Sequence, residues 1–128
     1  MEHKPIYMLA NDLFFASKVV KTAEASGVPA RAFDAAGRLI QASREKEPSL
    51  VLMDCERLER EAFRLLQEFH ADGKLSRVPC VGYLSHTARD LKGEMLAAGA
   101  TQVYFRSEFS KQLENLLMRY AGGLPSRF

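Results

Sequence analysis

Short, uninterrupted apolar runs alternate along this chain with segments in which apolar residues recur at helical spacing. The apolar runs predict strands at residues 6–10, 29–33, 50–53, 78–84 and 103–105. The periodic segments predict helices at about residues 12–26, 35–46, 58–72, 87–98 and 109–120. Continuous apolar strands are typical of a parallel sheet that is covered on both faces. With right-handed crossovers, the pattern predicts an α/β fold with a doubly wound, five-stranded parallel sheet.

Polar residues and glycines mark the expected ends of these elements. Gly27 and Gly99 each follow a periodic segment, where a glycine commonly ends a helix. Thr87 and Asp90 have the spacing of a helix N-terminal capping pair. Residues 1–121 are therefore expected to form one domain, and residues 122–128 a flexible C-terminal tail.

Composition and charge narrow the functional classes. The chain has 47% apolar and 27% charged residues, which is typical of a globular domain. Its net charge of +2, from 18 basic and 16 acidic residues, is too balanced to indicate a nucleic-acid partner. No apolar run approaches the roughly 20 residues that span a bilayer, so we expect no membrane segment and a cytoplasmic location. Cys55 and Cys80 match no zinc pattern and are expected to be structural thiols.

Candidate chemistry follows the strands. In a doubly wound sheet, the loops after the carboxyl ends of the strands form the usual functional edge. Those loops carry Asn11-Asp12, Asp54, Ser85-His86 and Arg106-Ser107. Two carboxylates, a hydroxyl and a cation are thus expected at one edge of the sheet. Residues 57–61 are expected to be a solvated helix start.

Three segments, in order and nearly end to end, resemble the receiver family of response regulators. The segment "PSLVLMD" is similar to the family's strand before the phosphoacceptor aspartate. The segment "RVPCVGYLS" is similar to the strand that ends in its Ser/Thr, and "AAGATQVYFRSEF" to its "AGA…KPF" segment. The resemblance implies a (βα)5 flavodoxin-like receiver fold with strand order 2-1-3-4-5. It also implies a single-domain receiver-like signalling module in a two-component phosphorelay.

The resemblance assigns roles to individual residues. Asp54 would be the phosphoacceptor, and Asp12, Asp54 and the backbone carbonyl of Glu56 would hold Mg²⁺. Ser85 would be the hydroxyl that moves towards a phosphoryl group, and Tyr104 occupies the aromatic switch position. A histidine kinase or another signalling protein would be the partner, and the face of the fourth helix, fifth strand and fifth helix could form a homodimer.

The same edge departs from the family's pattern. The acidic pair is Asn11-Asp12, which removes one carboxylate and predicts weaker Mg²⁺ binding. Arg106 and Ser107 replace the family's Lys-Pro, and a guanidinium is a planar fork with a longer reach than an ammonium group. His86 stands where a small residue is usual, and its role is open.

Several alternatives remain at this stage. Asp54 could only cap the next turn, Asp12 could only cap a helix, and Arg106 could pair with Asp54 or Asp12 in place of phosphate. The second functional hypothesis is therefore a pseudo-receiver, which acts through protein contacts without phosphorylation. A flavodoxin-like cofactor protein would need a glycine- or hydroxyl-rich loop after the first strand, and the chain has none there. No enzymatic activity is expected beyond self-phosphorylation or dephosphorylation at Asp54.

Of the pair Phe14-Phe15, one ring is expected in the core and the other on the surface, where Phe14 could contact a partner.

Overall fold

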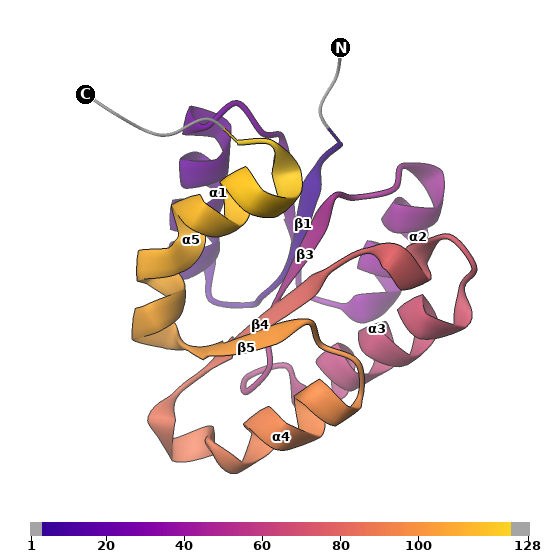
Figure 1. The fold of residues 1–128 in the computed structure, drawn as a ribbon, viewed down its shortest axis with the longest axis vertical. Coiled ribbons are helices and arrows are strands. Elements are labelled where there is room, and N and C mark those ends of the chain that lie inside the picture. The colour runs from indigo at the N-terminus through magenta and orange to yellow at the C-terminus, as the bar shows by residue number, and fades with distance from the viewer. Residues whose placement is uncertain (1–3, 124–128) are drawn as a thin grey trace.

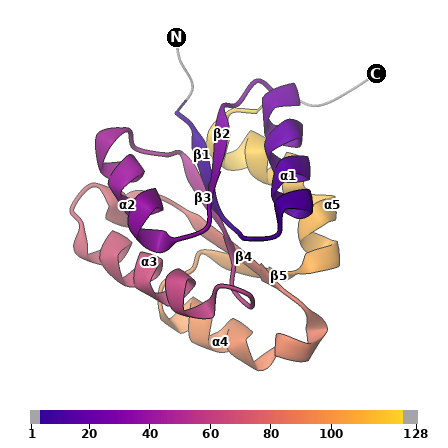
Figure 2. The same cartoon turned by 180° about the vertical axis from the view of Figure 1, so that it is seen from behind.

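A computed structural model describes residues 4–123 and shows a central sheet between two layers of helices (Figures 1 and 2). The strands are β1 (Ile6–Leu9), β2 (Ala30–Phe33), β3 (Leu50–Asp54), β4 (Cys80–Leu84) and β5 (Gln102–Phe105). The α-helices are α1 (Leu13–Ala25), α2 (Ala36–Glu45), α3 (Glu59–Ala71), α4 (Asp90–Ala97) and α5 (Arg106–Ala121). Two short 3₁₀ helices, η1 (Leu75–Arg77) and η2 (His86–Ala88), precede and follow β4.

The sheet has the predicted topology. All neighbouring strands are parallel, and their order is β2-β1-β3-β4-β5. The chain passes from β1 to β2 at one edge of the sheet and then continues from β3 to β5 towards the other edge. The change of direction therefore falls between the neighbouring strands β1 and β3. The fold class predicted from the sequence is therefore confirmed.

Two apolar clusters fill the spaces on either side of the sheet. One lies between the sheet and α1 and α5, and the other between the sheet and α2, α3 and α4. Residues of β3 alternate between the two: Leu52 belongs to the α1–α5 cluster and Met53 to the other. Burial on both faces explains why the strands are apolar without interruption.

The helix ends follow the sequence in part. Asp12 caps α1, since its Oδ1 accepts a hydrogen bond from the Phe15 backbone N–H at 3.1 Å. The Thr87–Asp90 cap was predicted wrongly: α4 begins at Asp90, and Arg89 precedes it without a side-chain cap. The Thr87 hydroxyl lies 2.7 Å from the Ser85 hydroxyl, so it is occupied elsewhere.

The C-terminal end of the domain is defined by glycines. Gly122 has a φ of 68°, a left-handed conformation that glycine adopts without steric cost, and it ends α5. The Gly123 N–H then donates to the Leu117 carbonyl at 2.9 Å. The first two residues of the predicted tail thus complete the helix end. Residues 124–128 lie outside the described part, so their flexibility stays a prediction.

The two cysteines are buried and free, as expected. Burial raises the pKa of both the Cys55 and the Cys80 thiol to about 12. Among residues 4–123, no helix is long and apolar enough to cross a membrane.

Candidate functional site

The parallel strands bring the predicted residues to one edge of the sheet. Asp54 is the last residue of β3, Ser85 follows β4, and Arg106 is the first residue of α5. All three line one cavity of about 270 Å³. The complete lining is Asp54, Glu56, Arg57, Tyr83, Leu84, Ser85 and Arg106.

Asp54 is a buried carboxylate with one engaged oxygen. Its residue is 2% exposed, and Oδ1 accepts hydrogen bonds from the backbone N–H groups of Glu56 at 3.1 Å and Arg57 at 2.9 Å. Burial raises the pKa of Asp54, although those N–H groups and nearby Arg106 and Arg57 act in the opposite direction. Oδ2 has no hydrogen-bond partner among the described residues. Asp54 therefore caps the next turn with one oxygen and keeps the other available.

Asp12 lies beside Asp54's cavity and is bound to Arg106. The Arg106 Nη2 donates to Asp12 Oδ2 at 2.9 Å, and the Phe15 N–H holds Oδ1. The hydrogen bond from Arg106 lowers the pKa of Asp12 below its usual range. The Arg106 guanidinium also lies 4.1 Å from the centroid of the Phe15 ring. Of the two pairings considered for Arg106, the structure shows the one with Asp12.

Ser85 faces the site, but its hydroxyl contacts a neighbour. Its backbone N–H donates to Glu56 Oε1 at 2.9 Å, which ties the loop after β3 to the end of β4. The Ser85 Oγ lies 2.7 Å from Thr87 Oγ1. The prediction that Ser85 reads out a phosphoryl group stays untested, and so does the role of the Glu56 carbonyl.

A second arginine, which the sequence analysis placed on a solvated helix start, joins the site. The Arg57 Nε donates to Asn11 Oδ1 at 3.0 Å, across 46 residues of chain. The amide at position 11 thus accepts from a cation where the family pattern has a carboxylate. No local pattern indicates this pairing, because it depends on how the loops after β1 and β3 meet.

Two aromatic residues of β5 lie on opposite faces of the sheet. Tyr104 packs against the α1–α5 cluster, and its hydroxyl donates to Gln102 Oε1 at 2.9 Å. Phe105 packs against the other cluster and stacks on His86, with ring centroids 3.9 Å apart. The ring in contact with the loop after β4 is therefore Phe105. The switch role of Tyr104 remains a prediction.

The donor set at this edge matches a hard divalent cation in chemistry. Mg²⁺ prefers oxygen ligands and retains several waters, so two carboxylates and a backbone carbonyl suit it. Asp54 Oδ2 is free, whereas Asp12 Oδ2 is taken by Arg106. A cation and the guanidinium would therefore compete for Asp12. Within residues 4–123, no cluster of three or more His, Cys, Asp or Glu side chains is placed to hold a metal ion.

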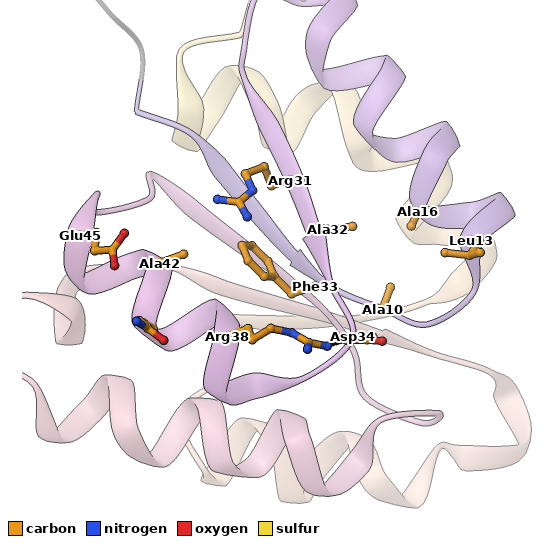
Figure 3. A pocket seen from close by; sticks show the side chains of 11 residues that line it. Ala10, Leu13, Ala16, Arg31, Ala32, Phe33, Asp34, Arg38, Ala42 and Glu45 are labelled. Carbon is orange, nitrogen blue, oxygen red and sulfur yellow. Dashed lines mark hydrogen bonds and ion pairs between the residues drawn. The ribbon is translucent and has the colours of Figure 1, made fainter.

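A second cavity, of about 540 Å³, lies elsewhere, along the edge strand β2 between α1 and α2 (Figure 3). Both of its arginines have local partners: Arg38 pairs with Asp34, and the Arg31 guanidinium lies 4.7 Å from the centroid of the Phe33 ring. No residue predicted to carry chemistry lines this cavity.

Comparisons with known proteins identify the fold. No protein-family model matches the chain, and no curated protein matches its sequence. The receiver domain of the sensor histidine kinase PA1611 from Pseudomonas aeruginosa PAO1, with magnesium in its active-site cleft, is similar in structure. It has 15% identity and a TM-score of 0.79 over 94% of this chain and 98% of its own.

Two further solved structures agree. The receiver domain of NtrX from Brucella abortus has 18% identity and a TM-score of 0.77, over 90% of this chain and 96% of its own. The phosphorylated cyanobacterial phytochrome response regulator RcpA has 14% identity and a TM-score of 0.76, over 92% of this chain and 94% of its own. The chain therefore has the fold of the response-regulator receiver domains.

Proposed function

We propose that the chain is a receiver-type signalling module of a two-component phosphorelay, with Asp54 as its phosphoacceptor in an atypical pocket. The observation that carries this proposal is the state of the Asp54 carboxylate. It is buried at the end of the central strand, and two backbone N–H groups hold Oδ1 while Oδ2 has no hydrogen-bond partner among the described residues. The fold supports it, since one similar structure is phosphorylated and another holds magnesium in its active-site cleft.

The chemistry would be phosphoryl transfer from a phosphohistidine of a histidine kinase. Asp54 Oδ2 attacks phosphorus, a new O–P bond forms and the P–N bond breaks. The electron pair of that bond passes to the imidazole ring, which takes up a proton. Phosphoryl transfer depends mainly on positioning and charge neutralisation. The Glu56 and Arg57 N–H groups orient the carboxylate, and the Arg57 and Arg106 guanidinium groups offset the developing charge.

Asp12, Asp54 and the Glu56 carbonyl would hold Mg²⁺, which when bound supplies further charge neutralisation at the phosphoryl oxygens. Arg106 donates to Asp12 through Nη2, one of its three guanidinium nitrogens, so a swing of the side chain towards a phosphoryl group would break this ion pair. Both side chains of that ion pair are partly exposed, at 41% and 22%, so separating them costs little. Ser85 and Tyr104 would report the change to the rest of the domain. We expect no enzymatic activity beyond the domain's own phosphorylation and dephosphorylation.

The signal would leave through the face formed by α4, β5 and α5, towards a protein partner or a second copy of the chain in the cytoplasm. Leu96 on α4 and Met118 on α5 are large apolar residues with exposures of 42% and 40%. Apolar side chains of this kind are typical of contact surfaces.

A pseudo-receiver is the second candidate, and one observation favours it. The ion pair of Arg106 with Asp12 and the hydrogen bond of Arg57 to Asn11 already give both arginines and Asp12 partners within the protein. Such a site would be stable without phosphate or metal, and the domain would act through protein contacts alone.

Amide NMR during a Mg²⁺ titration, with and without beryllofluoride as a phosphoryl mimic, separates the two. The proposal predicts chemical-shift changes centred on Asp54, Ser85 and Arg106 that vanish in Asp54→Ala. A spectrum that stays unchanged at millimolar Mg²⁺ with beryllofluoride would exclude phosphorylation of Asp54 and leave the pseudo-receiver.

A further inference from the structure

The Tyr83 hydroxyl is a buried polar group without a partner. The residue is 1% exposed, and its hydroxyl oxygen has no hydrogen-bond partner among the described residues. An unsatisfied buried hydroxyl is costly, and buried polar groups in native proteins are normally hydrogen-bonded. Packing in the core therefore explains the buried ring of Tyr83 but not its hydroxyl group.

Tyr83 and Asp54 are neighbours on one face of the sheet. They are paired in register across β3 and β4. Tyr83 belongs to the α1–α5 cluster, and Asp54 follows Leu52 of that cluster by two residues, so both side chains leave the sheet on the same side. Adjacent strands are only about 4.8 Å apart. Both residues line the cavity of about 270 Å³.

The ring of Tyr83 is held firmly. It stacks on Phe109 with ring centroids 4.7 Å apart and meets the edge of Phe15 at 5.1 Å. The Arg106 guanidinium packs over the Phe15 ring and also pairs with Asp12. The aromatic cluster and the ion pair are therefore in direct contact. The hydroxyl is thus fixed in position before any ligand arrives.

The charges around Tyr83 define the kind of ligand that it can bind. Burial raises the pKa of Tyr83, and the nearby carboxylate of Asp54 raises it further, so the phenol remains protonated. A neutral phenol donates one hydrogen bond, and Arg106 and Arg57 supply positive charge in the same cavity. A small oxyanion in this cavity would accept the hydrogen bond from Tyr83 and would be attracted by the positive charge of the two arginines.

We propose that the Tyr83 hydroxyl donates a hydrogen bond to an oxygen of the phosphoryl group carried by Asp54, as a second hydroxyl ligand of the pocket. This inference rests on the proposed function. Phosphorylation of Asp54 Oδ2 adds three strong acceptor oxygens beside a donor that has no other partner. The protein then recovers the hydrogen bond only in its phosphorylated state, which stabilises that state relative to the unphosphorylated one.

Affinity for Mg²⁺-beryllofluoride, measured by titration and amide NMR, tests the inference in Tyr83→Phe. The lost hydrogen bond to a charged acceptor is expected to weaken binding by roughly tenfold to a hundredfold. Tyr7→Phe is the matched control, because it removes the same group from a buried tyrosine of β1 whose hydroxyl donates to the Lys46 carbonyl, away from the cavity. We expect wild-type affinity in that control.

Two measurements exclude a merely structural effect. Without ligand, Tyr83→Phe should unfold at the wild-type temperature or above it, because the removed hydroxyl is unpaired; a clearly lower temperature would indicate a packing role and overturn the inference. In the wild-type protein, the Tyr83 hydroxyl proton should become observable and shift downfield when beryllofluoride binds.

The outcomes separate this inference from the proposed function. If the wild-type protein binds beryllofluoride and Tyr83→Phe binds it within about twofold, the inference is wrong and Asp54 remains the phosphoacceptor. Equal weakening in Tyr83→Phe and Tyr7→Phe would also overturn it. If the wild-type protein does not bind beryllofluoride at all, the proposed function fails and this inference fails with it.

Discussion

Asp12 and Asp54 are carboxylates at the same edge of the sheet, yet their surroundings move their pKa values in opposite directions. The hydrogen bond from Arg106 lowers the pKa of Asp12, whereas burial raises the pKa of Asp54. A lowered pKa stabilises the fold above about pH 4 and is lost in acid. A raised pKa has the opposite sign, because its contribution is present in acid and is lost as pH rises through the folded-state pKa.

Removing the charge of Asp54 should therefore stabilise the protein at neutral pH. Asp54→Asn retains an Oδ1 that accepts from the Glu56 and Arg57 N–H groups, so only the charge is removed. We expect the unfolding temperature at pH 7 to rise by roughly 4 °C, the shift that about 1 kcal/mol produces in a domain of this size. At pH 3, below the unfolded-state pKa of about 3.9, the difference should disappear. Thermal unfolding at both pH values checks this, and an equal gain at both would contradict it.

Arg106 should compete with Mg²⁺ for Asp12. Arg106→Gln releases Asp12 Oδ2 and removes a positive charge, so Mg²⁺ affinity should increase by roughly fivefold, since a unit charge at 4 Å contributes about 1 kcal/mol in water. Calorimetric titration gives the value. Arg38→Gln, which breaks the ion pair with Asp34 away from the site, should leave the affinity unchanged. Unchanged Mg²⁺ binding in Arg106→Gln would show that Asp12 is not a ligand.

At the scale of elements, the end of β3 packs closely over β4. Cys55 follows Asp54 directly and is fully buried, and its backbone N–H donates to the Tyr83 carbonyl of β4 at 3.0 Å. A Cβ added to Gly82 would collide with the Cys55 Sγ. Glycine at position 82 therefore makes room for the turn that places Asp54 and the N–H groups beyond it.

Gly82→Ala should cost about 1–3 kcal/mol of unfolding free energy through overpacking. In a Cys55→Ala background, which removes the Sγ atom, the same substitution should cost much less. A double-mutant cycle from urea unfolding measures this coupling. Additive effects of the two substitutions would show that the Cys55 contact is not the cause.

For the molecule as a whole, the two apolar clusters on either side of the sheet hold the fold together. Some large apolar residues lie outside both clusters, on the surface. Phe109 on α5 is fully buried against Tyr83, while Phe14 on α1 is 93% exposed beside Leu13, which is 82% exposed. The expected division of the Phe14-Phe15 pair is confirmed, since Phe15 packs against the α1–α5 cluster. The Phe14 ring thus lies on the surface and makes no part of the hydrophobic core.

Unfolding experiments should separate these two phenylalanines. Phe109→Ala is expected to cost about 3–5 kcal/mol, because it leaves a cavity between α5 and the sheet. Phe14→Ala should stay within about 0.5 kcal/mol of the wild-type protein. Chemical denaturation of both variants measures the difference. A large loss in Phe14→Ala would indicate that its ring is covered in solution.

The sequence by itself determined the order of the elements, the parallel sheet and the edge that holds the polar residues. These features follow from periodicity and from the continuous apolar strands, which each segment carries within itself. The cap at Asp12 was also predictable, because its partner lies three residues away. The Thr87–Asp90 cap failed although it was equally local, since the Thr87 hydroxyl contacts Ser85 instead.

Only the tertiary structure decided which groups meet at that edge. Arg106 and Asp12 are 94 residues apart, and Arg57 and Asn11 are 46 apart, so their pairing depends on strand order and loop path. The position of Tyr83 beside Asp54 depends on the register of β3 against β4 and on the face to which each side chain points. A local pattern identifies the residues that reach the edge of a parallel sheet, whereas register and packing determine the partners that they find there.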